Sequence, residues 1–169
     1  KTTGASATRN ADVATMGPTV APDKLGTELI VDGDFPSLDN FSQTAAGNFS
    51  VSGGILEVEP TANFSRVYQS VPTEVGKRYR ASVFGRTESS SDGYALYAGT
   101  AALGGDASAY GKANSQTTDF LEITVDFTAT TTTAFIGVGD QGSPDTTDSH
   151  FFHTLSLKEI LPGPERVTN

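Results

Sequence analysis

Tyrosine and arginine are residue types that proteins use to recognise sugars, and three tyrosines and two arginines of this chain are candidates for that role. Aromatic faces stack on the C–H faces of sugar rings, and guanidinium groups donate hydrogen bonds to hydroxyls or carboxylates. Tyr94 and Tyr97 have opposite parity along one predicted strand, so only one of them can line a given face of a sheet. The competing interpretation is one core tyrosine, one partly exposed tyrosine and ordinary surface arginines. The candidate ligand-binding residues are Tyr94, Tyr97, Tyr110, Arg66 and Arg86.

Two groups of aspartates offer the oxygen ligands that calcium prefers. Asp32, Asp34 and Asp39 lie in one turn region, and the second group is Asp140, Asp145 and Asp148. Neither group has the alternating spacing, ending in Glu, of an EF-hand loop. Asp is also a favoured turn former, so each group has a purely structural interpretation. We predict a structural calcium at Asp32 and Asp34 and rank the second group below it.

The residues that could carry catalysis do not form a recognisable motif. The sequence has two histidines, His150 and His153, and alternation predicts that His153 shares a face with Leu155 and Leu157. A packed histidine with one hydrogen bond is the simplest interpretation. Ser and Asp are abundant, but no Gly-x-Ser-x-Gly elbow accompanies them, and no acidic residue has an apolar context that would raise its pKa. The sequence therefore predicts a protein that is not an enzyme.

Composition and charge argue against several classes of partner. The 169 residues carry a formal net charge of −9, and an acidic surface repels nucleic-acid phosphates and anionic lipid headgroups. The absence of cysteine excludes a disulfide framework and thiolate metal ligands. No apolar run approaches the ~18 residues of a membrane-spanning helix. The chain begins at Lys1 without a Met, and we interpret it as a piece of a longer polypeptide.

The pattern from Phe64 to Arg86 predicts two strands joined by a turn. Side chains alternate up to Val71, the sequence Pro-Thr-Glu-Val-Gly-Lys interrupts them, and alternation resumes at Tyr79. Eighteen glycines and eight prolines fit short strands and tight turns. The Asn-Phe-Ser triplets at 40–42, 48–50 and 63–65 are interpreted as loop-to-strand junctions with a buried Phe. Further strands are predicted at 29–31, 55–59, 94–98, 121–127, 134–138 and 151–159.

These patterns predict an all-β fold with about eight to ten strands and no amphipathic helix. Long connections alternate with tight ones, which favours an antiparallel two-sheet β-sandwich wound as a jelly roll. Ala134–Val138 is apolar on nearly both faces, so we expect it to be a central strand. The predicted organisation is an extended linker or docking arm at 1–27, the sandwich at 28–160 and a C-terminal tail at 161–169.

Five segments of the chain form a recognisable series: Val31–Phe35, Val67–Val71, Pro72–Tyr79, Phe127–Ala129 and Phe152–Glu159. In this order they resemble the jelly-roll carbohydrate-binding modules attached to polysaccharide-degrading enzymes and to phage structural proteins. The resemblance covers about residues 28–159 and implies the same fold and a sugar ligand. In that family an Asp in the closing strand is often associated with a structural calcium, but this chain has His153 there; the chain also lacks the family's sugar-stacking Trp.

The segment Gly4–Ala14 is similar to connectors of phage tail-fibre and minor structural proteins, which read Ser-Ala-Thr-Arg-x-Ala-Asp-Val. The resemblance implies a non-catalytic virion module, in a fibre, spike or capsid-attached appendage, that binds host surface glycans. Other virion proteins are then its partners, and a homo-oligomer or symmetric array is expected in the extracellular particle. Two alternatives stay open: a purely structural decoration module without sugar binding, and an accessory module of a secreted bacterial polysaccharidase.

Overall fold

The structure is a computed structural model that describes residues 23–90, 92–102, 108–142 and 148–163. These residues form eleven β-strands and no helix, which confirms the predicted all-β sandwich. No helix within these ranges therefore has the length and apolar character needed to cross a membrane. The strands are β1 (Lys24–Glu28), β2 (Ser42–Gln43), β3 (Gly47–Ser52), β4 (Ile55–Pro60), β5 (Arg66–Pro72), β6 (Arg78–Thr87), β7 (Tyr94–Gly99), β8 (Gly111–Ser115), β9 (Leu121–Thr128), β10 (Thr133–Asp140) and β11 (His150–Leu161).

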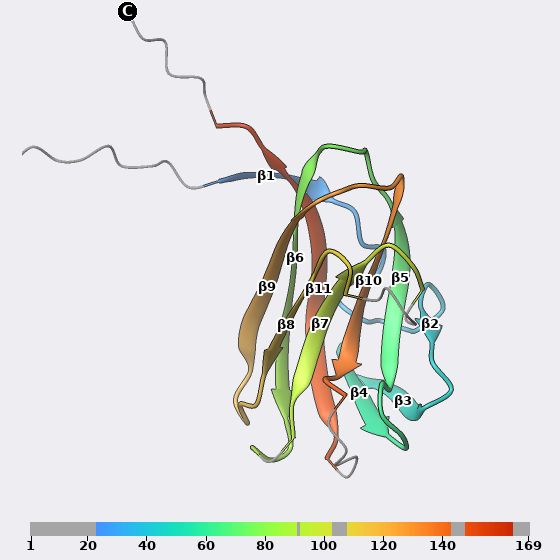
Figure 1. Cartoon of the computed structure of the whole chain (residues 1–169). Coiled ribbons are helices and arrows are strands. Elements are labelled where there is room, and N and C mark those ends of the chain that lie inside the picture. The colour runs from blue at the N-terminus through green and yellow to red at the C-terminus, as the bar shows by residue number, and fades with distance from the viewer. Residues whose placement is uncertain (1–22, 91, 103–107, 143–147, 164–169) are drawn as a thin grey trace, which may run out of the picture.

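The strands form two antiparallel sheets that lie face to face (Figure 1). One sheet has six strands in the order β3-β4-β11-β6-β9, and β1 pairs with β11. The other has five strands in the order β2-β5-β10-β7-β8. β10 is the middle strand of the five-stranded sheet, which confirms the central position predicted for Ala134–Val138. Figure 1 shows β1 and the end of β11 at one end of the sandwich.

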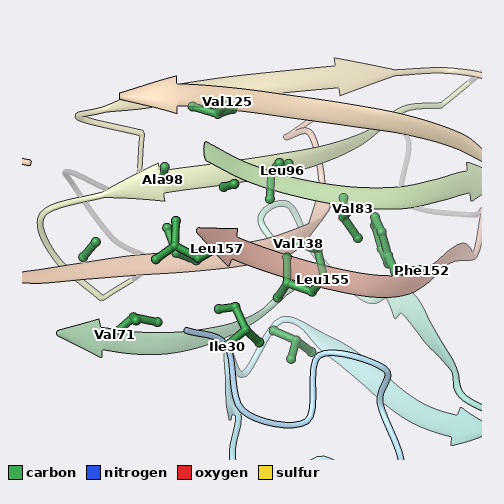
Figure 2. Close-up of a cluster of buried hydrophobic side chains, with 14 of the residues drawn as sticks. Ile30, Val71, Val83, Leu96, Ala98, Val125, Val138, Phe152, Leu155 and Leu157 are labelled. Carbon is green, nitrogen blue, oxygen red and sulfur yellow. The ribbon is translucent and has the colours of Figure 1, made fainter. Parts of the chain in front are cut away.

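Alternating side chains from the two sheets meet in one hydrophobic core (Figure 2). Val83 from β6 and Leu157 from β11 face Leu96 and Val138 of the other sheet, and all four are fully buried. Burying an aliphatic side chain of this size stabilises a fold by roughly 1.5–3 kcal/mol. The predicted alternation on β6, with Tyr79, Ala81 and Val83 on one side, is therefore confirmed.

The sandwich begins at Lys24 rather than Glu28, because β1 pairs with the end of β11. Residues 29–31, predicted as a strand, instead form an irregular segment after β1. The side-chain amide of Gln69 accepts a hydrogen bond from Val31 N at 2.9 Å and donates one to Val31 O at 3.0 Å. The Gln69 side chain therefore satisfies both backbone groups of Val31, which a neighbouring strand would otherwise pair. The expected arm up to residue 22 lies outside the described residues.

A β-bulge in β11 makes the predicted orientation of His153 wrong. The pairing of β11 with β6 shifts register between His153 and Ser156, and Thr154 has a φ of 55°. The extra residue inverts the alternation. Leu155 and Leu157 are buried as predicted, but His153 points outward and stacks on Phe84 with ring centroids 5.0 Å apart.

Candidate functional site

The outer side of the five-stranded sheet, called the five-stranded face below, carries a row of aromatic residues. Tyr68 of β5 lies opposite Gly137 of β10, and Gly137 lies opposite Tyr97 of β7. The neighbouring residues in these strands point into the core, so the tyrosines point away from it. Phe135 lies on the same side, with its ring centroid 6.3 Å from that of Tyr68.

On the five-stranded face, Phe64, Arg66 and Tyr97 form a stack. The Arg66 guanidinium lies 3.7 Å from the Tyr97 ring centroid and 4.6 Å from that of Phe64. Arg66 is 5% exposed and Tyr97 is 1% exposed. Burial raises the pKa of Tyr97 to about 12, against the opposing effect of Arg66. The Arg66 guanidinium thus covers the Tyr97 ring and also contacts the Phe64 ring.

Phe64 is the exposed member of this stack, with 51% of its surface accessible. Its φ of 68° lies in the left-handed region, which is rare for a bulky residue and costs roughly 1–3 kcal/mol. The Asp140 side chain stabilises this conformation, because its Oδ2 accepts a hydrogen bond from Phe64 N at 2.8 Å. The left-handed backbone, stabilised by this hydrogen bond, therefore leaves the Phe64 ring exposed to solvent.

A short chain of polar groups lies beside the stack. Lys112 Nζ lies 5.6 Å from the Tyr97 ring centroid and donates a hydrogen bond to Gln141 O at 3.0 Å. Asn114 Nδ2 donates to Gln141 Oε1 at 3.2 Å. Aromatic surface beside ammonium and amide groups is one arrangement that proteins use for sugars, since rings can cover C–H faces and polar groups can bond to hydroxyls.

The structure brings two of the five candidate ligand-binding residues together, Arg66 and Tyr97. Tyr94 is in the core with 0% exposure, and its ring meets Phe152 edge to face at 5.7 Å. Arg86 lies on the outer side of the other sheet, with its guanidinium 4.0 Å from the Phe151 ring centroid. Tyr94 and Arg86 therefore do not share the five-stranded face.

Tyr110, the fifth candidate, joins β8 to the turn between β9 and β10. Its ring stacks on Phe127 with centroids 4.6 Å apart. Its hydroxyl oxygen accepts hydrogen bonds from Thr130 N at 3.0 Å and Thr131 N at 3.1 Å. Burial acts to raise the pKa of Tyr110, but the hydrogen bonds from Thr130 and Thr131 outweigh it and lower that pKa. These contacts tie the edge of one sheet to the other.

Replacing Tyr110 with Phe is expected to lower the free energy of unfolding by about 1 kcal/mol, because two backbone amides lose their acceptor. Urea unfolding followed by circular dichroism measures the effect. Tyr68→Phe is the matched control, since the Tyr68 hydroxyl has no hydrogen-bond partner among the described residues, and it should change stability by less than about 0.5 kcal/mol. Equal effects for the two variants contradict the assigned role of Tyr110.

The aspartates predicted to bind calcium lie in the irregular segment after β1. Asp32 Oδ2 accepts a hydrogen bond from Asn40 Nδ2 at 2.5 Å, and Asp32 has a φ of 55°. Asp34 is exposed in the same turn. Calcium binding by Asp32 and Asp34 stays a prediction. In the second group, Asp145 lies outside the described residues and Asp140 points into the interior.

Sequence reasoning missed three aromatic residues of the five-stranded face: Phe64, Tyr68 and Phe135. Alternation contained the signal for two of them, because Val67 and Val71 point inward and place Tyr68 outward, and because β10 is apolar on both sides. Phe64 carried no such signal. It was expected to be buried, and its left-handed backbone makes that expectation wrong.

No family model matches the sequence, and no curated protein sequence is similar to it. Solved structures of carbohydrate-binding modules are similar in fold. The CBM22-1 xylan-binding domain of Paenibacillus barcinonensis Xyn10C has a TM-score of 0.57 at 7% identity, over 86% of this chain and 100% of that one. TmCBM61, solved with β-1,4-galactotriose, has a TM-score of 0.55 at 13% identity, and the match covers 78% of this chain and 98% of that one. A CBM4 structure has a TM-score of 0.54 at 13% identity, and the match covers 75% of this chain and 82% of that one. The chain therefore has the two-sheet β-sandwich of these modules.

Proposed function

We propose that this chain is a non-catalytic glycan-binding module that binds sugars on its five-stranded face. We further propose that it serves as an adhesion module of a phage virion, in a fibre, spike or capsid-attached appendage, where it contacts host surface glycans. Sugar binding rests on the site and on the fold shared with carbohydrate-binding modules. The virion role rests on the similarity of Gly4–Ala14 to phage connectors.

The observation that carries sugar binding is the exposed ring of Phe64, held by a strained backbone beside a buried arginine. A protein rarely maintains strain of this kind unless the surrounding structure requires it, and such residues cluster at binding sites. Phe64 provides a flat apolar platform, and Tyr68 and Phe135 extend aromatic surface along the same side of the sheet. Lys112, Asn114 and Gln141 supply groups for sugar hydroxyls.

A single shallow site of this kind binds its sugar weakly. Repeated copies in a symmetric array convert the second and later contacts into intramolecular ones, and avidity can exceed the single-site affinity by about 10²–10⁴-fold. We therefore expect a homo-oligomer or an array of this module on the particle, with other virion proteins as its partners.

The test is a glycan array probed with the protein fused to a trimerising coiled coil. The array includes xylan, β-1,4-galactan, β-glucans and bacterial surface polysaccharides. For the best ligand, Phe64→Ala is expected to weaken binding by about tenfold, the equivalent of about 1.4 kcal/mol of stacking. Isothermal titration calorimetry measures the affinity of each variant.

Phe120→Ala is the matched control, because Phe120 is an aromatic with 37% exposure next to β9 in the other sheet. It should leave the affinity unchanged. Circular dichroism must show that both variants are folded. An equal loss of glycan affinity in the two variants, or a loss of affinity only in Phe120→Ala, would contradict binding on the five-stranded face. No binding by the trimer to any glycan favours a purely structural decoration module.

The second candidate is an accessory module of a secreted polysaccharide-degrading enzyme. It is favoured by the similarity in fold to modules of xylanases, among them the CBM22-1-GH10 modules of Clostridium thermocellum Xyn10B, with a TM-score of 0.56 at 12% identity over 87% of this chain and 30% of that one. The gene distinguishes the two roles. A catalytic domain in the same reading frame supports the accessory role, and neighbouring virion genes support adhesion.

A further inference from the structure

Three ionisable side chains meet inside the sandwich. They come from the end opposite β1, where β7 and β11 begin and β10 ends (Figure 1). Asp92 lies just before β7, Asp140 is the last residue of β10, and His150 is the first residue of β11. One ligand atom from each lies within 4.8 Å of the other two, and His150 Nε2 is 3.8 Å from Asp92 Oδ2. None of the three is more than 1% exposed.

The same end of the core contains buried polar atoms with no hydrogen-bond partner in the described part of the chain. Neither ring nitrogen of His150 has a hydrogen-bond partner among the residues that the structure describes, and the same is true of Tyr94 Oη and Thr87 Oγ1. Thr87 lies opposite His150, and Tyr94 lies opposite Asp140, in the strand pairings. Native proteins rarely leave buried polar groups unsatisfied, and an ion or ordered water is the usual explanation.

The chemistry of the cluster indicates which ligand it takes. Two carboxylates and an imidazole offer up to two negative charges in a buried environment, where such charges are costly unless a cation neutralises them. Imidazole nitrogen suits Zn²⁺ and related ions, whereas Ca²⁺ and Mg²⁺ prefer oxygen ligands alone. Metal–ligand bonds of about 2.0–2.2 Å place ligand atoms roughly 3–4.4 Å apart, so a slight contraction of the cluster suffices.

We propose that Asp92, Asp140 and His150 form a buried site for one divalent transition-metal cation, of which Zn²⁺ is the probe. The ion binds one imidazole nitrogen and one oxygen from each carboxylate. Burial lowers the pKa of His150, against the opposing effects of Asp140 and Asp148, and so favours the neutral imidazole that ligates metals.

The site connects the two sheets and reaches the five-stranded face. β7 and β10 belong to the five-stranded sheet and β11 to the six-stranded sheet, so one ion joins both layers. Asp140 also accepts hydrogen bonds through Oδ2 from Phe64 N and through Oδ1 from Gly142 N. Each carboxylate oxygen has a second lone pair for the ion. The bound metal therefore fixes the residue that holds Phe64 in its left-handed conformation.

The experiment begins with elemental analysis of the purified protein, followed by removal of metal with a chelator and titration with ZnCl₂. We expect one Zn²⁺ per chain by calorimetry and a rise in the unfolding midpoint of roughly 5 °C or more at saturating Zn²⁺. His150→Gln should abolish both effects. His153→Gln is the matched control, because His153 is partly exposed on the outer side of the six-stranded sheet, and it should keep both.

A second measurement uses the unaltered protein and does not depend on the folding of a variant. The chain has two histidines, so ¹⁵N NMR of the imidazole nitrogens resolves them. Zn²⁺ should shift the signals of one histidine, His150, and leave His153 unchanged. Failure to bind Zn²⁺, a response confined to His153, or a His150 ring protonated on both nitrogens at neutral pH would overturn the proposal. None of these readouts involves sugar binding, so the two proposals fail separately.

Discussion

Replacing Gly33 with Ala is expected to lower the free energy of unfolding by more than about 3 kcal/mol, or to prevent folding. A Cβ at this position lies 2.0 Å from the backbone oxygen of Leu155, far inside van der Waals contact. Gly33 O also accepts a hydrogen bond from Leu155 N at 2.7 Å, so the two backbones cannot separate without losing it. Because the clash is with backbone, no side-chain rotation relieves it, and overpacking of this kind is strongly destabilising.

Urea unfolding or thermal melting of Gly33→Ala, compared with the unaltered chain, measures this effect. Gly26→Ala is the matched control, since a Cβ there has ordinary contacts with Glu159 at 3.5 Å. The control should change stability by less than about 1 kcal/mol. A Gly33→Ala variant as stable as the control would show that the turn after β1 does not pack against the β11 bulge as described.

The second large effect is expected for Glu28→Ala, which should lower the free energy of unfolding by about 2 kcal/mol. The Glu28 carboxylate accepts hydrogen bonds from the backbone nitrogens of Leu29, Ile30 and Leu157 at 2.8–3.0 Å. It also accepts one from Ser156 Oγ at 2.6 Å. Hydrogen bonds to a charged group contribute about 1.5–3 kcal/mol. The side chain is 38% exposed, so water compensates part of the loss.

Guanidinium unfolding of Glu28→Ala and Glu28→Gln tests this role. Gln keeps one acceptor oxygen, so Glu28→Gln should lower the free energy of unfolding by less than Glu28→Ala does. Glu122→Ala is the control, because Glu122 is exposed on β9 and should tolerate the change within about 0.5 kcal/mol. If Glu28→Ala costs no more than Glu122→Ala, the Glu28 carboxylate does not stabilise the junction of β1 with β11.

Both predictions concern the segment that follows β1. Glu28 and Gly33 lie on either side of the irregular residues 29–32, and both contact the bulge region of β11, at the far end of the chain. This segment therefore helps to close the sandwich against β11. The same residues say little about the ligand.

The sequence by itself determined the fold class and most of the strands. Alternation is a local property with a period of two residues, so a strand with one buried side can be recognised from a short stretch of sequence. Leu121–Phe127 shows it on β9, where Ile123, Val125 and Phe127 are buried and the residues between them are exposed. The same rule separated Tyr94 from Tyr97 and required that one of them leave the core.

Only the tertiary structure decided which residues form the candidate sites. One extra residue in β11 turned His153 away from the core, because a bulge reverses alternation and leaves no local signal. The exposed ring of Phe64 depends on a hydrogen bond to Asp140, which is 76 residues away in the chain. The cluster of Asp92, Asp140 and His150 forms where three strands end together in space. Periodicity within a window contains no information on such long-range pairings, which arise only when the two sheets close over the core.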